Sequence, residues 1–225
     1  MDRRENIRNA YRLTGSNSFY DGMMTCSTLA GKAVCRLVWA MSPQECEAYQ
    51  EKAMSGVPMD FSGRLLEVPV GTGVLTMPLY QTLPKADFTC LDYSPDMMGQ
   101  AKAKAERLQL KNVVFQQGDV GALPYEEGSF DIVMSLNGFH AFPDKEAAYR
   151  ETYRVLKPGG TFCGCFYVKG EHPRTDRLIR RVYERMKFFT PPYETADSLR
   201  ARLMGLYSKV ELGTVKSIAW FVCRK

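Results

Sequence analysis

The sequence predicts an α/β fold: a doubly wound sheet of seven strands, mostly parallel with an antiparallel C-terminal strand, covered by helices. From Arg64 onward, short apolar runs typical of buried strands alternate with segments of helical period, which indicates a parallel sheet. The last two strand candidates are too close in the chain for a crossover helix, so they are expected to be antiparallel. The 225 residues, 45% hydrophobic and 24% charged, suit one globular domain with at most a small appendage.

Two or three N-terminal helices are expected ahead of the sheet. Residues 2–14 carry one amphipathic face, and a second apolar run covers residues 24–41. Ser42 then has the chemistry of a helix N-cap, Pro43 suits the first helical turn, and Glu45 can reach back to the cap. A further helix is therefore predicted to begin at this point.

Five apolar runs are the expected strands of the parallel part of the sheet, at residues 65–68, 88–92, 112–117, 131–136 and 161–168. Helices are expected between them, at residues 74–83, 95–108 and 144–156. Pro78 falls within the first of these helices and must lie in its first turn or kink it. The chain is predicted to close with two helices and two strands, at residues 174–188, 195–204, 209–212 and 214–223, with Gly213 as the link between the strands.

Polar residues and glycines follow the strands at the edge where an open parallel sheet binds its ligands. Gly71 and Gly73 follow the first strand and let the backbone approach a ligand closely. Asp92 follows the second strand, nineteen residues after Gly73, a spacing that suits a carboxylate accepting both hydroxyls of a ribose. Asp119 follows the third strand, and Ser135 lies near the end of the fourth. Together they predict that this edge binds a nucleoside.

Four segments resemble the class I S-adenosylmethionine-dependent methyltransferases, and within them the small-molecule type related to the quinone-biosynthesis methyltransferases. They are LLEVPVGTG at 65–73, LDYSPDMM at 91–98, GDVGALPYEEGSFDIVMSLNGFHAFPD at 118–144 and RETYRVLKPGGTF at 150–162. The resemblance is close over residues 60–168. It implies a Rossmann-like fold, S-adenosyl-L-methionine as cofactor, S-adenosyl-L-homocysteine as product, and methyl transfer to a small-molecule acceptor by in-line displacement.

The resemblance assigns the methionine part of the cofactor to the first and fourth strands. Glu67 and the backbone from Gly71 to Gly73 are expected to hold it, and Ser135 and Leu136 are expected to border it. Pro69 stands where the family most often has its first glycine. Proline lacks the N–H donor but keeps its carbonyl, which suffices if the loop accepts a hydrogen bond from the cofactor's ammonium group.

The resemblance assigns the adenosine part to the second and third strands. Asp92 is expected to take the ribose hydroxyls, while Tyr93 and Met97 line the adenine pocket. Asp119 is expected to accept from the adenine amino group, and the Val120 amide to donate to the ring.

The N-terminal segment and one histidine complete the expected site. In relatives the segment before the first strand folds over the cofactor, so residues 1–60 are expected to form a lid, with Tyr20 against the cofactor, and residues 61–225 the S-adenosylmethionine-binding domain. His140 is the candidate general base, needed only if the acceptor arrives protonated, because imidazole titrates near neutrality. A structural role for His140 stays open.

Composition limits the binding partners, cellular location and metal sites that can be expected. The net charge of +5 is modest for a nucleic-acid-binding protein, so no nucleic-acid partner is predicted; the oligomeric state stays open. Neither a membrane-spanning run nor a signal-peptide core is seen, so a cytoplasmic location is expected. The seven cysteines include no Cys-x-x-Cys pair and are expected to be reduced and packed in the core, so no metal site is predicted.

Three other functions compete with this interpretation. An NAD(P)-dependent oxidoreductase would need a third glycine where Thr76 stands. A non-catalytic S-adenosylmethionine-binding protein would explain Pro69 as a mark of lost turnover. An RNA or protein methyltransferase is opposed by the modest charge and by the absence of Asn-Pro-Pro-Tyr after the fourth strand.

Overall fold

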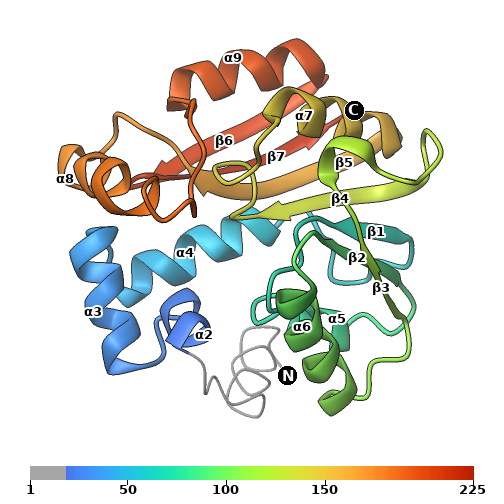
Figure 1. Cartoon of the computed structure of the whole chain (residues 1–225). Helices are drawn as coiled ribbons and strands as arrows, with labels where there is room; N and C mark the ends of the chain where they lie inside the picture. Colours follow the sequence, from blue (N-terminus) through green and yellow to red (C-terminus); the bar gives the residue numbers. More distant parts are fainter. Residues whose placement is uncertain (1–18) are drawn as a thin grey trace.

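A computed structural model describes residues 19–225, in which one sheet separates two layers of helices (Figure 1). The sheet has the order β3-β2-β1-β4-β5-β7-β6. Its strands are β1 Arg64–Glu67, β2 Asp87–Asp92, β3 Val113–Gln117, β4 Phe130–Leu136, β5 Leu156–Tyr167, β6 Lys209–Val215 and β7 Ile218–Arg224. Only β7 runs against its neighbours, so the predicted fold class is confirmed.

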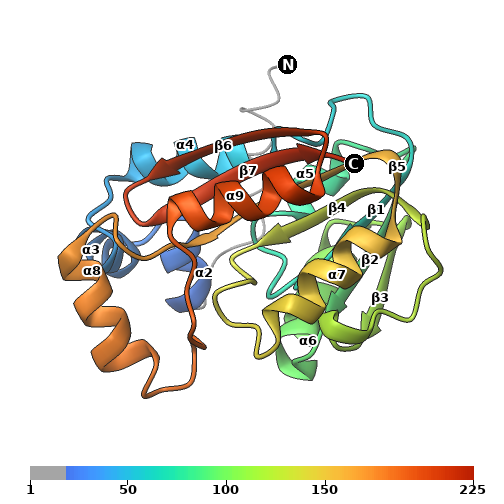
Figure 2. The same ribbon diagram turned by 90° about the horizontal axis from the view of Figure 1, so that it is seen from above.

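The helices lie on both faces of the sheet. One face is covered by α4 Pro43–Met54, α5 Met77–Gln81 and α6 Pro95–Arg107, with α2 Phe19–Met24 and α3 Leu29–Val38 at their side (Figure 1). The other face carries α7 Lys145–Val155 and α9 Ala196–Leu206 (Figure 2). Near α3 lie α8 Pro173–Leu178 and the π-helical turn Ile179–Tyr183 that follows it. The predicted helix at residues 2–14 lies outside the described residues.

Local chemistry fixes the helix starts as the sequence predicts. Ser42 Oγ accepts from the Glu45 amide at 3.2 Å, and Glu45 Oε2 accepts from the Ser42 amide at 2.8 Å, which closes the predicted capping box of α4. Pro78 lies in the first turn of α5, where its missing N–H costs no helical hydrogen bond. Neighbouring residues of β1 alternate between faces, so Leu65 and Leu66 belong to separate hydrophobic cores.

Three sequence predictions about element boundaries are wrong. The link between β6 and β7 is Lys216–Ser217, with Lys216 in the left-handed region at φ 50°, whereas Gly213 lies within β6. A Cβ on Gly213 would lie 2.7 Å from the Trp220 ring, so packing rather than turning requires glycine there. Strand β5 begins at Leu156 rather than at residue 161, so the helix predicted at 144–156 ends at Val155, and the helix predicted at 174–188 divides into α8 and the π-helical turn.

Among residues 19–225, none of the helices combines the length and the apolar character that crossing a membrane requires.

Candidate functional site

The loop after β1 is held in a conformation that leaves open space above its backbone. Gly71 and Gly73 have φ of 57° and 68°, a region that residues with a side chain rarely adopt. A Cβ on Gly71 would meet nothing within 4 Å, whereas one on Gly73 would lie 2.9 Å from Met77. Gly71 therefore borders free space in which a ligand can approach the backbone, and Gly73 lets α5 pack close beneath the loop.

Asp92 joins the ends of β1 and β2. Its Oδ2 accepts from the Gly71 amide at 2.7 Å, and its Oδ1 accepts from the Ser94 amide at 2.8 Å. The residue is 6% exposed. Because each carboxylate oxygen has two acceptor sites, each oxygen of Asp92 retains a site after these two bonds. This arrangement suits a ligand with two adjacent hydroxyls.

Glu67 lies at the end of β1, beneath the loop. It is 2% exposed, and Tyr80 Oη donates to its Oε2 at 2.7 Å. Burial raises the pKa of the Glu67 carboxyl to about 8, so the acid is mostly protonated at neutral pH. A cation placed beside Glu67 would stabilise its ionised form and release that proton.

The residues expected at the adenine side lie beside Asp92 along the sheet edge. The Gly118 amide donates to the Asp92 carbonyl at 3.1 Å, which brings the β3 end against the β2 end. Asp119 is exposed and its Oδ1 accepts from the Gly121 amide at 2.8 Å, while Val120 is buried. Tyr93 is 77% exposed, and Met97, in the first turn of α6, is half-buried. Their contacts with adenine stay a prediction.

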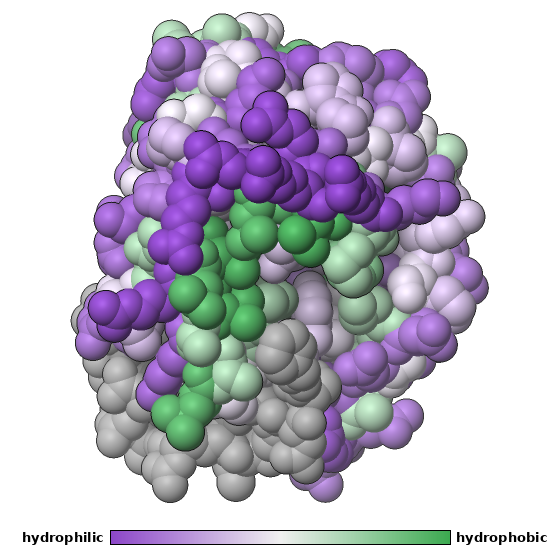
Figure 3. Space-filling view, turned by 60° about the vertical axis from the view of Figure 1, so that its left-hand side comes forward, coloured by the Kyte–Doolittle hydropathy of each residue, from purple (hydrophilic) through white to green (hydrophobic). Residues whose placement is uncertain are grey.

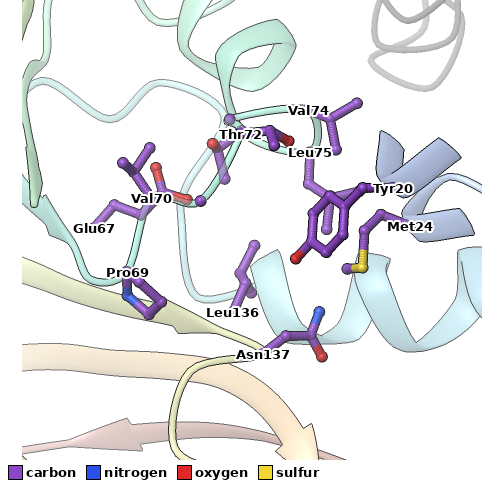
Figure 4. Close-up of a pocket in the computed structure, with 13 residues that line it drawn as sticks. Tyr20, Met24, Glu67, Pro69, Val70, Thr72, Val74, Leu75, Leu136 and Asn137 are labelled. Atoms are coloured by element: carbon purple, nitrogen blue, oxygen red, sulfur yellow. The ribbon is translucent and has the colours of Figure 1, made fainter. Parts of the chain in front are cut away.

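A cleft that is partly open to solvent lies between the β1 loop, α2 and the end of β4 (Figure 4). Six of the predicted cofactor-binding residues line it: Tyr20, Glu67, Pro69, Gly71, Gly73 and Leu136. Thr72 lies within the predicted backbone from Gly71 to Gly73, and the residues that the sequence did not indicate are Met24, Val70, Val74, Leu75, Thr76 and Asn137. Ser135 is fully buried and is not among the residues that line the cleft.

Asn137 offers an unused donor to this cleft. It has a left-handed backbone with φ 56°, which asparagine tolerates better than most residues, and its amide donates to the Cys165 carbonyl at 2.7 Å. Its side-chain Nδ2 is buried without a hydrogen-bond partner, and the side chain extends into the space below Tyr20 (Figure 4). A buried donor of this kind is costly unless a ligand satisfies it.

Helix α2 is joined to the loop after β1 through Asp21. The Thr72 hydroxyl donates to Asp21 Oδ1 at 2.6 Å, and Lys104 Nζ of α6 lies 2.8 Å from Asp21 Oδ2, both side chains of this ion pair being buried. Removing one partner of a buried pair leaves a charge without compensation. The pair therefore positions Tyr20, the neighbour of Asp21, over the cleft.

His140 is packed rather than exposed. Its ring stacks on Phe189 at 3.9 Å between centroids, and its Nδ1 accepts from the Tyr167 amide at 3.2 Å. Burial, with a smaller effect from the Lys145 charge, lowers its pKa to about 3. His140 is therefore neutral at pH 7 with Nδ1 already occupied, and it is absent from the residues lining the cleft. Its role as a base stays a prediction.

Comparison with known proteins decides the family. A family model described as a methyltransferase domain matches residues 65–160. The demethylmenaquinone methyltransferase of Oceanobacillus iheyensis is 33% identical over 160 residues, which cover 64% of this chain and 67% of the relative. The chain belongs to the class I S-adenosylmethionine-dependent methyltransferases. S-Adenosyl-L-methionine is accordingly its cofactor.

Other class I methyltransferases match shorter stretches. The demethylmenaquinone methyltransferase of Thermus thermophilus is 42% identical over 97 residues, 43% of this chain and 44% of the relative. The chain thus spans less than half the length of the first curated relatives it matches.

Solved structures support the class I methyltransferase fold. The YcgJ protein of Bacillus subtilis has a TM-score of 0.64 at 22% identity, over 75% of this chain and 71% of that one. The [4+2]-cyclase SpnF has a TM-score of 0.66 at 19% identity, over 81% of this chain and 82% of the cyclase chain. Since a cyclase shares the architecture, these likenesses show the fold alone.

Proposed function

We propose that this protein transfers a methyl group from S-adenosyl-L-methionine to a small hydroxylated aromatic acceptor and releases S-adenosyl-L-homocysteine. The observation that carries the proposal is the cleft at the strand ends: Asp92 does not line it, but it accepts from the amide of Gly71, which does, and keeps free acceptor sites on both oxygens. A buried carboxyl, Glu67, and a buried donor without a partner, Asn137, line the same cleft. An adenosyl group with a cationic methionine end fits this donor and acceptor set.

The cofactor's two ends match different parts of this edge. Asp92 accepts the ribose hydroxyls, with Asp119 and the Val120 amide beyond it for the adenine ring. Glu67 and the Pro69 carbonyl, beside the open backbone of Gly71, receive the methionine end, whose positive charge favours the ionised form of Glu67. A bound dinucleotide would need a pyrophosphate cradle and a third glycine, and Thr76 occupies that position.

The acceptor side is rich in aromatic rings. Trp39 packs against Tyr167, Tyr183 and Phe189, with ring centroids 6.2 to 6.4 Å apart, and Phe189 also stacks on His140 of the loop that carries Asn137. These rings do not themselves line the cleft, but they pack on the loop that carries Asn137, whose Nδ2 a ring oxygen of a flat apolar acceptor would satisfy.

Apolar surface extends from the same side of the molecule. Figure 3 looks onto the side that carries α3 and α8 and shows hydrophobic residues gathered in a hollow below a hydrophilic ridge. Exposed apolar side chains on α3 and in the segment after α8 are Leu29, Leu37, Val182, Met186 and Phe188. The named relatives act on demethylmenaquinone, an acceptor of this flat and apolar kind.

The chain's own contribution to the reaction is alignment and desolvation. When bound, the cofactor supplies a methyl group on a positively charged sulfur; the carbon–sulfur bond breaks as the methyl bonds to the acceptor, which loses a proton. Positioning alone lowers such a barrier by roughly 7 to 11 kcal/mol. Asn137 orients the acceptor oxygen, Tyr20 and Met24 close the cleft from α2, and the acceptor proton passes to solvent.

The proposed partners are the cofactor and this acceptor, without nucleic acid, and the proposed location is the cytoplasm. The test incubates purified protein with S-adenosylmethionine and a panel of soluble hydroquinones, catechols, amines and tRNA, with S-adenosylhomocysteine release as readout. Release with a hydroquinone or catechol supports the proposal. Release only with amines or tRNA, or binding of NADH in place of S-adenosylmethionine, overturns it. Binding of S-adenosylmethionine without any release favours the non-catalytic alternative.

A further inference from the structure

Three cysteines that do not line the cleft converge between α2, α3 and α4. Cys26 follows α2, Cys35 lies in α3 and Cys46 lies in α4, and their Sγ atoms all lie within 4.8 Å of one another. The sulfurs of Cys26 and Cys46 are 2.9 Å apart. Each of the three residues is between 3% and 4% exposed. Spacings of nine and eleven residues in the sequence match no metal-binding motif, so the fold alone reveals the cluster.

A fourth sulfur completes the group. The thioether of Met41, which is 2% exposed, lies 3.9 Å from Cys46 Sγ. Among the described residues, the potential ligands in this cluster are three thiols, and neither histidine nor a carboxylate belongs to it. The donor set is therefore composed of soft sulfur atoms alone.

The backbone at Cys26 supports a specific role. Cys26 has φ of 49°, a left-handed conformation that costs about 1–2 kcal/mol in a residue with a side chain. Such outliers gather where a side chain must point in one direction, as in ligand clamps. Here the unusual backbone aims Cys26 Sγ at Cys46, while the Cys35 thiol donates to the Met23 carbonyl at 3.3 Å.

We propose that Cys26, Cys35 and Cys46, with Met41 alongside, bind one monovalent copper ion. Thiolate and thioether ligands suit Cu(I), zinc and iron–sulfur clusters. Structural zinc almost always takes four ligands from cysteine, histidine and carboxylates, and the cluster offers three such ligands plus a thioether, which favours Cu(I). Sulfurs around one ion at a metal–sulfur distance of about 2.3 Å are about 4 Å apart, so the cluster binds the ion after Cys26 and Cys46 separate by about 1 Å.

The site is separate from the methyl-transfer cleft but linked to it mechanically. Cys26 lies two residues after Met24, which lines the cleft, and α2 also carries Asp21 and its buried ion pair with Lys104. An ion that joins α2, α3 and α4 would stabilise the native state, which binds it, over the unfolded chain. Its binding does not depend on which acceptor the cleft takes.

The test is an anaerobic titration of the reduced full-length protein with Cu(I), in competition with a colorimetric Cu(I) chelator, and in parallel with Zn²⁺. One Cu(I) per chain, an increased Tm and an affinity that falls by at least about 10-fold in Cys46→Ser are expected, since even the loss of a supporting contact has an effect of that size. Cys223→Ser, a buried cysteine on β7, is the matched control and should bind as the wild type does.

X-ray absorption on the wild type tests the same site without any variant and should find only sulfur neighbours around the copper. Nitrogen or oxygen neighbours, equal affinity in Cys46→Ser, or binding of Zn²⁺ but not Cu(I) would overturn the proposal. A Cys26–Cys46 disulfide in protein isolated without oxygen, with no copper uptake after reduction, would overturn it as well.

Discussion

Asp92→Asn tests the residue on which the cofactor assignment most depends. The carboxylate accepts from the Gly71 and Ser94 amides through different oxygens, so the asparagine NH₂ must face one of these N–H groups and lose its bond. The same change removes one of the two free acceptor sites expected to take the ribose hydroxyls. A hydrogen bond to a charged group contributes about 1.5–3 kcal/mol, so the affinity for S-adenosylhomocysteine should fall about 10- to 150-fold.

Calorimetric titration measures this affinity, and thermal unfolding reports the loss of the internal bond. One unpaired amide costs about 1–3 kcal/mol, which corresponds to a decrease in Tm of about 2–12 °C for a chain of this size. Asp87→Asn, at the exposed opposite end of β2, is the matched control and should leave both quantities unchanged. A dissociation constant for Asp92→Asn within threefold of wild type, in a folded protein, would refute the assignment of Asp92 to the ribose.

Three further substitutions test the neighbouring groups. The pKa of Glu67 is about 8 in the native state against the ordinary 4.5, so the native state binds more protons and the free energy of unfolding should fall as pH rises from 4.5 to 8. Glu67→Gln should flatten this pH dependence, measured by urea unfolding. The pKa of His140 is about 3 in the native state against the ordinary 6.5, so the unfolded state takes up the proton first as pH falls. The free energy of unfolding should therefore decrease by at most about 1.4 kcal/mol per pH unit between pH 6.5 and pH 3. His140→Gln should remove that slope, and an unchanged slope would place the titration elsewhere. A Cβ on Gly138 would lie 2.4 Å from Pro69 Cδ, so Gly138→Ala should destabilise the protein by about 1–3 kcal/mol, with partial recovery when combined with Pro69→Ala; additive losses in the double variant would contradict this contact.

The sequence predicts the sheet and the polar edge well because both follow from local rules. Apolar runs separated by helical segments imply parallel strands, and parallel strands bring their carboxyl ends to one edge. Glu67, Gly71 and Asp92 are therefore found together in the structure, with the Asp92–Gly71 bond joining neighbouring strand ends. The structure also shows what the Pro69 ring contacts: it lies so close to Gly138 that position 138 has no room for a side chain.

The remaining features depend on contacts between distant parts of the chain. Asp21 meets Thr72 and Lys104, and nothing in the sequence around Asp21 indicates either partner. Gly213 reads as a turn residue, yet it is needed because the Trp220 ring covers it across the hairpin.

The spacing of the three clustered cysteines in the sequence does not indicate that they lie together. Cys26, Cys35 and Cys46 come together only through the packing of three helices. One residue type in the sequence after β4 could have indicated Asn137: asparagine adopts a left-handed backbone more often than most residues, and Asn137 does so here.

The central claim is methyl transfer at the strand-end cleft, and isotope transfer measures it most directly. The protein is incubated with S-adenosylmethionine carrying a trideuterated methyl group and with a soluble hydroquinone, and the acceptor is analysed by mass spectrometry. The account predicts an acceptor in which one trideuteromethyl group has replaced one hydrogen, formed by the wild type and strongly reduced in Asp92→Asn. An unmodified acceptor in the presence of bound cofactor, or equal product from both proteins, would contradict it.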